Sequence, residues 1–348
     1  MNVSRRDQLL LGGAVVATVA AGLARSVGGV TAFVVAAIAL ALLATCVGTA
    51  VEHLGERVSP AMTGVLQSAL GNLPELLILE FALNKGLISV VQATIVGSIL
   101  ANVALVLGLA FIAGGLKHGV QSFPGPAARD IGLTLMLAVS ALAVPSLTSS
   151  LHTPAAGHER ALSVIVAVVL LIAFVLLLVY TLRQPTADVQ EHATDGWPLW
   201  LAVAVLAGTG LLAALASDWF VNALEPAIDT LGISQAFAGL VIVAIAGNAV
   251  ENVVGIQLAL KNKSEAALQV VLQSPIQIAL VVAPVVLLLA PALGAASFTL
   301  VLPPLLLVAL LLSALIAVLV TFDGEFTWYE GLVLIALYVL LAASFWWG

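Results

Sequence analysis

The sequence predicts an all-α polytopic membrane protein with about eleven transmembrane helices. Of its 348 residues, 62% are hydrophobic and only 8% are charged, against roughly a quarter charged in an average soluble domain. This small number of charged side chains cannot cover the surface of a water-soluble protein of this size. The surrounding solvent must therefore be lipid. Apolar stretches separated by short polar breaks recur along the whole chain, and we expect no soluble domain.

Eleven stretches reach or approach the length of about 20 apolar residues that a helix needs to cross a bilayer. The connections between them contain Gly, Pro or charged residues. The predicted spans are residues 8–24, 29–51, 62–83, 88–114, 130–150, 161–182, 197–217, 236–260, 265–291, 296–320 and 328–347. Arg5 and Arg6 before the first stretch resemble an export signal, but further membrane-spanning sequence follows, so we expect a retained first helix.

Basic residues predict the orientation of the chain. With the N-terminus inside, eight of the 11 Lys and Arg residues fall on the inner side, and only Arg25, Lys85 and Arg160 fall on the outer side. Loops rich in Lys and Arg stay in the cytoplasm, so we expect a cytoplasmic N-terminus in the inner membrane of a prokaryote. The net charge is −7 and the basic residues are scattered, so nucleic acid is not an expected partner.

An internal repeat follows the first helix. The motif Gly71-Asn72-Leu73-Pro74-Glu75 in the third predicted span recurs 176 positions later as Gly247-Asn248-Ala249-Val250-Glu251 in the eighth. At the same spacing Lys85 matches Lys261 and Ser98 matches Ser274. Chance matches of polar residues are rare inside apolar helices, so these matches indicate a duplication.

The repeat predicts the domain organisation. We expect an N-terminal transmembrane helix in residues 1–28, a first five-helix repeat in 29–182, an acidic cytoplasmic linker in 183–196 and a second five-helix repeat in 197–348. An odd number of spans in each repeat gives the two repeats inverted topology. This architecture is typical of transporters, in which equivalent helices of the two halves build one site near the bilayer midplane.

Glu75 and Glu251 are the strongest candidates for function. Each lies well inside a predicted span, where a charged side chain costs roughly 3 kcal/mol or more. Since no Lys or Arg lies nearby in the sequence, either protons or a bound cation must neutralise them. We therefore predict a shared cation and proton site, with the alternative that both acids stay protonated and join helices by hydrogen bonds.

Other polar residues around these acids supply oxygen atoms. The asparagines precede the acids by one helical turn, and Pro74 removes a donor and so frees a carbonyl oxygen. Ca²⁺ favours about six to eight oxygen ligands, and two carboxylates neutralise its charge. The predicted ligand set contains no sulfur and no His, which disfavours copper and zinc. It consists of Glu75, Glu251, Asn72, Asn248, Ser98, Ser274, Asn102 and Gln277.

Two further acids, Glu52 and Glu225, occupy related positions in the two repeats. Each is predicted to end a span one element before its Gly-Asn motif. We expect them either to line the two cation entrances or to be solvated at the membrane surface.

The sequence resembles the cation/proton exchanger (CAX) branch of the calcium/cation antiporter superfamily. The resemblance rests on the two Gly-Asn-x-x-Glu motifs, on residues 97–102 (GSILAN) and on residues 274–278 (SPIQI), and covers nearly the whole chain. It implies an antiporter in which Glu75 and Glu251 bind Ca²⁺ and protons competitively, with the other six residues of the ligand set nearby. The chain departs from the usual family motifs at Leu73, Pro74, Gln273 and Pro275.

Several alternatives stay open at this point. Na⁺ or K⁺ as the coupling ion, or Mn²⁺ as the substrate, would use the same residue types. A cation channel would conduct without countertransport and usually has symmetric subunits. An intramembrane enzyme is disfavoured because HExxH, GxSxG and phosphate-binding glycine motifs are missing from the sequence. The expected partners are Ca²⁺, H⁺ and the lipid bilayer, with no cofactor, and the oligomeric state is open.

Overall fold

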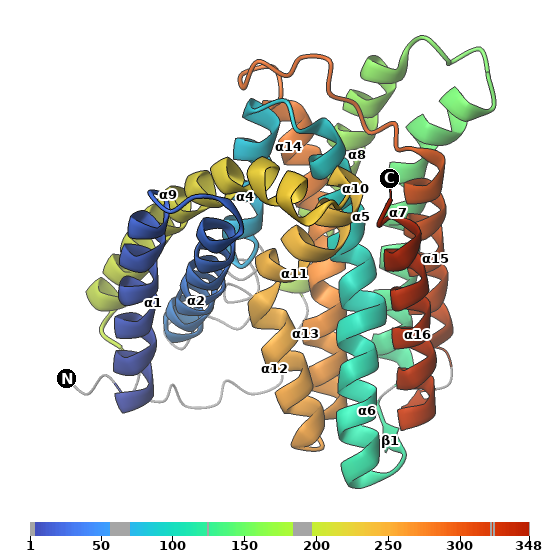
Figure 1. The fold of residues 1–348 in the computed structure, drawn as a ribbon. Coiled ribbons are helices and arrows are strands. Elements are labelled where there is room, and N and C mark those ends of the chain that lie inside the picture. Colours follow the sequence, from blue (N-terminus) through green and yellow to red (C-terminus); the bar gives the residue numbers. More distant parts are fainter. Residues whose placement is uncertain are drawn as a thin grey trace. The chain divides into compact units, whose positions relative to one another are not determined.

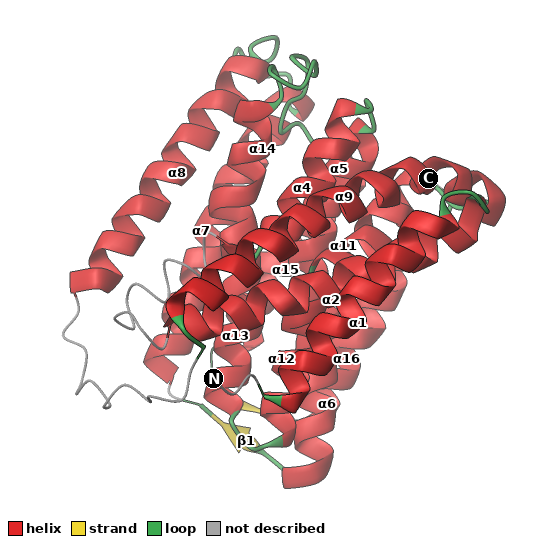
Figure 2. Cartoon of the chain, turned by 90° about the vertical axis from the view of Figure 1, so that its left-hand side faces the viewer, coloured by secondary structure: helices red, strands yellow, loops and turns green. Residues whose placement is uncertain are grey.

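The computed structural model describes residues 4–55, 70–123, 125–183, 197–320, 322 and 324–347, and these residues are almost entirely helical (Figure 1, Figure 2). The strands within this part are β1 (Gln121–Ser122) and β2 (Glu325–Phe326), which pair antiparallel. Among the described residues, seven helices are long and apolar enough to cross a membrane, or eight if a bent pair counts as one span. The predicted all-α membrane architecture is confirmed, and the number of eleven spans stays a prediction.

Each predicted span contains helical residues among those described. The helices, including three π-helical segments labelled η, are α1 (Arg5–Ala24), α2 (Gly29–Gly55), α4 (Leu73–Asn84), α5 (Ile88–Leu100), η1 (Ala101–Val106), α6 (Leu107–His118), α7 (Gly125–Ser150), α8 (Glu159–Arg183), α9 (Leu199–Leu231), α10 (Gln235–Phe237), η2 (Ala238–Val243), α11 (Ala244–Gly247), α12 (Ala249–Leu260), α13 (Ser264–Gln277), η3 (Ile278–Val282), α14 (Ala283–Leu289), α15 (Pro304–Val320) and α16 (Trp328–Ser344).

Two predicted boundaries were wrong. The span 197–217 is too short, because α9 continues through Leu231 and ends at Gly232, which adopts the left-handed conformation that commonly terminates helices. The span 296–320 begins too early, because α15 starts at Pro304. Proline disfavours helical geometry in the residue before it and is well tolerated at the first position of a helix, which explains this start.

The chain forms two compact units that do not coincide with the predicted repeats. The first unit comprises Met1–Phe81 and Ala173–Gly232, and the second comprises Ala82–Ile172 and Ile233–Gly348. Residues of both predicted repeats therefore contribute to each unit.

The first unit contains α1, α2 and α9, with α2 antiparallel to α9. Near the start of α2 the ring of Phe33 stacks on Phe220, with centroids 4.7 Å apart. At the other end of α2 the ring of His53 stacks on Trp197, which precedes α9, with centroids 4.5 Å apart. The N-terminal helix α1 packs on α2, since the thiol of Cys46 donates to the carbonyl oxygen of Leu10.

The second unit is built around two antiparallel helical runs, which are Ile88–His118 (α5, η1, α6) and Ser264–Leu289 (α13, η3, α14). Gln92 near the start of the first run bonds to Thr299, beyond the end of the second run. Ser264 at the start of the second run bonds to Ser122, beyond the end of the first. Each run therefore begins where the other ends.

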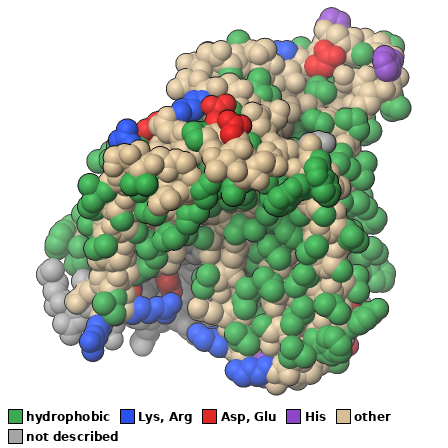
Figure 3. Space-filling model, in the orientation of Figure 1, with side chains coloured by type: hydrophobic (Ala, Val, Ile, Leu, Met, Phe, Trp, Pro, Cys, Tyr) green, Lys and Arg blue, Asp and Glu red, His purple; other side chains and the backbone are tan. Residues whose placement is uncertain are grey.

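The surface of the second unit fits a lipid environment. In Figure 3 hydrophobic side chains cover much of the visible flank of this unit, and Lys and Arg side chains gather where α6 and α12 end. There Lys117 and His118 both contact the carbonyl oxygen of Leu260, each at 2.9 Å. Large apolar side chains such as Leu137 and Leu340 are about 70% exposed, which is expected of residues that face acyl chains.

Candidate functional site

A helix breaks at the second Gly-Asn motif. Helix α11 ends at Gly247, α12 begins at Ala249, and the flanking segments Gln235–Gly247 and Glu251–Leu260 meet at 63°. Both the backbone N–H of Asn248 (3.2 Å) and its side-chain Nδ2 (2.9 Å) donate to the carbonyl oxygen of Ala244. Asparagine competes in this way with helical hydrogen bonding, which accounts for a break at this residue. The predicted span 236–260 therefore consists of two helical segments joined by a sharp bend.

The first Gly-Asn motif coincides with a helix start. Gly71 and Asn72 form a turn, and α4 begins at Leu73. The part of the predicted span 62–83 that covers residues 62–69 lies outside the described residues. Asn72 thus stands directly before α4, as Asn248 stands directly before α12.

These helix starts place the two acids in corresponding positions. Glu75 lies in the first turn of α4 and Glu251 lies in the first turn of α12, so each acid stands at a helix start inside its predicted span. The N-terminus of a helix carries a partial positive charge that favours a carboxylate. Glu75 is 1% exposed, and Glu251 is half-buried. The partial positive charge of a helix start therefore acts on each of the two acids.

A buried hydrogen-bonded cluster surrounds Asn248. Its Nδ2 donates to Ser98 Oγ on α5 at 3.0 Å. Its Oδ1 accepts from Ser274 Oγ on α13 at 2.9 Å and from Asn102 Nδ2 in η1 at 3.2 Å. Since Nδ2 also donates to Ala244, both N–H groups and both lone pairs of this amide are in use. The structure thus brings together Ser98, Asn102, Asn248 and Ser274, four of the eight predicted ligands.

The two asparagine side-chain oxygens of the cluster differ in whether they are free to bind a cation. Asn102 Oδ1 is buried without a hydrogen-bond partner among the described residues, and its Nδ2 is held by Ser98 O at 2.9 Å and by Asn248. It is therefore available as a hard oxygen ligand. Asn248 Oδ1 can coordinate a cation only if it gives up a hydrogen bond from Ser274 or Asn102.

Close helix packing positions Ser98. A Cβ atom on its neighbour Gly97 would lie 2.2 Å from the carbonyl oxygen of Leu240 in η2, and one on Gly239 would lie 2.5 Å from Val90 O. Only glycine allows the two backbones to approach this closely. The contact brings α5, which carries Ser98, against the segment that leads to Asn248.

The other four predicted ligands are Gln277, Glu251, Asn72 and Glu75, and they lie in different parts of the chain. Gln277 is buried at the end of α13. Glu251 follows Asn248 in the second unit, whereas Asn72 and Glu75 belong to the first unit. All hydrogen bonds described for the cluster join residues of the second unit. The participation of Asn72 and Glu75 in a common site therefore stays a prediction.

Sequence reasoning missed the residue Asn252 and several irregularities of the backbone. Asn252 Nδ2 donates to Ile245 O at 3.4 Å across the helix break, and its Oδ1 is buried without a partner among the described residues. Its position directly after Glu251 was the available signal. The π-helix η1 begins at Ala101, three residues after Ser98, and η3 begins at Ile278, directly after Gln277. Such segments often mark functional sites, but no sequence pattern indicates them here.

Glu52 and Glu225 lie near opposite ends of the antiparallel pair α2 and α9. Glu52 is in the last turn of α2 beside His53, and Glu225 is in the part of α9 that follows Phe220. Both side chains are exposed. Glu225 lies within α9 rather than after it, because that helix is longer than predicted.

Two helices of this lipid-facing bundle start at a Gly-Asn motif and carry an acid in their first turn. Such helix breaks with polar groups inside the membrane are typical of membrane transporters of ions. The model of the sodium/calcium exchanger protein family matches residues 28–183 and 201–347. The chain belongs to this family, and it is a transporter rather than an enzyme.

Individual proteins agree with this assignment. A protein of Aphanothece halophytica named Ca(2+)/H(+) antiporter is 34% identical over 338 residues, which cover 91% of this chain and 90% of that protein. The structure of native YfkE has a TM-score of 0.83 and 30% identity, with 98% of this chain and 99% of that chain covered. The crystal structure of the H+/Ca2+ exchanger CAX has a TM-score of 0.78 over 98% of this chain and 92% of that chain, at 16% identity, and so agrees in fold.

Proposed function

We propose that this protein exchanges Ca²⁺ for H⁺ across the membrane by alternating access, with Glu75 and Glu251 as the shared cation and proton site. The observation that carries the proposal is the matching position of the two acids, each in the first turn of a helix that starts at a Gly-Asn motif. The relative from Aphanothece halophytica, which is named Ca(2+)/H(+) antiporter, supports the choice of ions.

Charge balance explains the exchange. Two carboxylates neutralise one Ca²⁺, and two protons neutralise the same carboxylates. A site with two uncompensated charges is costly to carry through a region without water. Either neutral form can therefore cross, whereas the empty charged form cannot, so Ca²⁺ and protons take alternate steps. Asn102 Oδ1 and, after exchange of a hydrogen bond, Asn248 Oδ1 supply further oxygen ligands, together with Asn72, Ser98, Ser274 and Gln277.

The proposal includes two inverted repeats, residues 29–182 and 197–348, after an N-terminal helix in 1–28 and joined by the linker 183–196. Two observations support it. The family model matches in two stretches, 28–183 and 201–347. The runs that carry Ser98 and Ser274 are antiparallel within the second unit, as inverted copies would be.

The orientation and the entrances belong to the same proposal. An inner membrane with a cytoplasmic N-terminus is supported by the distribution of Lys and Arg residues in the sequence. Glu52 and Glu225 lie at opposite ends of α2 and α9, as the entrances from the two sides of the membrane would.

The test uses purified protein in sealed vesicles loaded with a pH-sensitive dye. Addition of Ca²⁺ outside should move protons out of vesicles that contain the wild-type protein, and Glu75→Gln and Glu251→Gln should each abolish this movement. Glu265→Gln is the matched control, because Glu265 is exposed on α13. Full exchange in either of the first two variants contradicts the proposal. Replacement of the pH gradient by a Na⁺ or K⁺ gradient, and of Ca²⁺ by Mn²⁺, tests the alternatives.

A further inference from the structure

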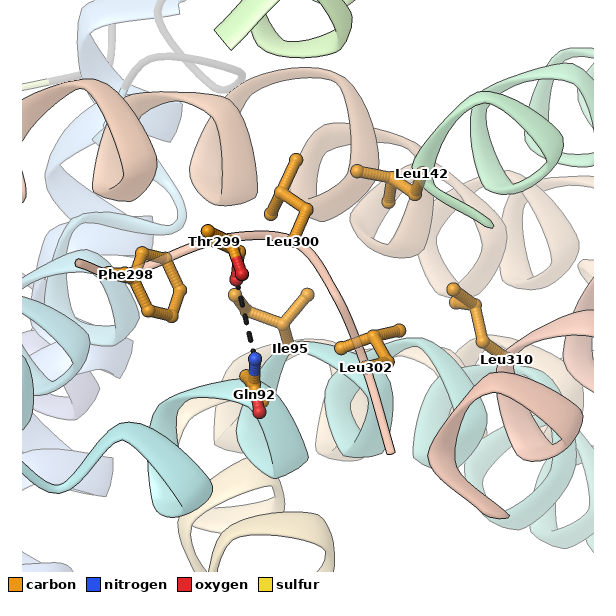
Figure 4. A pocket seen from close by; sticks show the side chains of 8 residues that line it. All are labelled: Gln92, Ile95, Leu142, Phe298, Thr299, Leu300, Leu302 and Leu310. Carbon is orange, nitrogen blue, oxygen red and sulfur yellow. Dashed lines mark hydrogen bonds between the residues drawn. The ribbon is translucent and has the colours of Figure 1, made fainter. Parts of the chain in front are cut away.

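The chain directly before α15, from Phe298 to Leu302, has no helical or strand structure and is held by side chains of other helices (Figure 4). Gln92 on α5 donates from Nε2 to the carbonyl oxygens of Thr299 (3.3 Å) and Val301 (2.8 Å). Phe298 and Leu300 from this segment are 1% and 3% exposed. An irregular backbone inside a membrane protein is stable only where its polar groups find partners within the protein.

Side chains of α7 and α8 bond to further backbone groups of this segment. Ser146 Oγ donates to Leu300 O at 3.1 Å and accepts from Leu302 N at 2.8 Å. Ser163 Oγ accepts from Leu300 N at 3.1 Å, and Arg160 donates to Phe298 O. Every residue from Phe298 to Leu302 therefore has a backbone group bonded to a side chain from α5, α7 or α8.

At the opposite end of the second unit, the segment after the first run is bonded to residues at the start of the second run and just before it. Gln121, which follows α6, donates from Nε2 to Asn262 Oδ1 (2.7 Å) in the turn before α13 and to Ala259 O (3.3 Å) near the end of α12. Ser264 at the start of α13 donates to Ser122 O at 2.5 Å. The segment after each run is thus bonded at the start of the other run.

We propose that these two segments, Gln121–Phe123 and Phe298–Leu302, are end clamps that fix the axial position of α5 relative to α13, with Gln92 and Gln121 as positioning residues for ion binding. The ion-binding part of this inference rests on the proposed function. Gln92 and Ser98 lie on one helix, about 9 Å apart along its axis. A slip of α5 by one residue moves Ser98 by about 1.5 Å, which is too far to keep its 3.0 Å bond to Asn248.

The test compares Gln92→Leu and Gln121→Leu with the control Gln269→Leu. Gln269 is exposed on α13 and bonds to Glu265 on the same helix. Loss of either clamp lowers the fraction of molecules with the ligands aligned, so the Ca²⁺ concentration for half-maximal exchange should rise about tenfold. The maximal rate should stay within about twofold, because the aligned fraction is restored at saturating Ca²⁺. Ser146→Ala is a milder variant and should change the same parameter by a smaller factor.

Hydrogen exchange provides a readout that does not depend on the transported ion. Amides around the helix break, including that of Asn248, should exchange faster in both clamp variants and not in the control. If the wild-type protein moves no Ca²⁺, the proposed function fails, and the exchange at Asn248 still decides whether the clamps set the helix position. Unchanged exchange at Asn248, or a lower maximal rate with an unchanged half-maximal concentration, overturns the inference.

Discussion

Replacement of Asn248 by Ala tests whether one amide organises the site. The side chain makes four hydrogen bonds, two through Nδ2 to Ser98 and Ala244 and two through Oδ1 from Asn102 and Ser274. Each buried bond contributes about 1 kcal/mol net. The groups left behind can re-pair in part, so we expect Asn248→Ala to lower the free energy of unfolding by about 2–4 kcal/mol.

The control for this variant is Asn222→Ala. Asn222 is exposed on α9 and donates from Nδ2 to Asp218 O at 2.8 Å, the same local bond that Asn248 makes with Ala244. Since this position is solvated, the control should cost less than about 1 kcal/mol. Unfolding would be followed by denaturant titration in detergent micelles, and Ca²⁺ exchange would be measured in vesicles. Equal losses of stability in the two variants would refute the role of Asn248 as the centre of the cluster.

Three further predictions follow from the packing and from the charges. Gly97→Ala should lower the free energy of unfolding by about 1–3 kcal/mol, because the new Cβ would lie 2.2 Å from Leu240 O. Gly208→Ala should instead raise it by about 0.5–1 kcal/mol, because a Cβ at this position of α9 would meet nothing within 4 Å. Similar effects of the two substitutions in denaturant titrations would contradict this reasoning. Glu52→Gln and Glu225→Gln should each weaken Ca²⁺ uptake from one side of the membrane only, and equal effects in right-side-out and inside-out vesicles would exclude separate entrances. Acidification should raise the Ca²⁺ concentration for half-maximal binding because protons occupy the same acids, and binding that is independent of pH would rule out competition.

Much of the membrane architecture could be predicted because hydrophobic length is a strong signal. The polar motifs were equally visible, since Ser98, Asn102, Asn248 and Ser274 are rare polar residues in apolar stretches, and the structure joins all four. Their partners could not be predicted, because a bond between α5 and the chain before α12 depends on how distant helices pack.

The backbone irregularities were missed for different reasons. Residues 296–303 are mostly apolar and read as part of a helix, although Pro303 and Pro304 were a signal that the helix starts later. The break at Asn248 had a weaker signal, because a Gly-Asn pair is also compatible with a continuous helix. The π-helices η1 and η3 had none, because their geometry depends on tertiary contacts.

Proton release on Ca²⁺ binding tests the central claim most directly. Purified protein in weakly buffered detergent solution would be titrated with Ca²⁺ while the pH is recorded, for the wild type and for Glu75→Gln and Glu251→Gln. We predict that Ca²⁺ binding to the wild type releases protons and that each substitution removes both the binding and the release. Tight Ca²⁺ binding without proton release in the wild type, or unchanged release in either variant, would contradict a site that the metal and protons share.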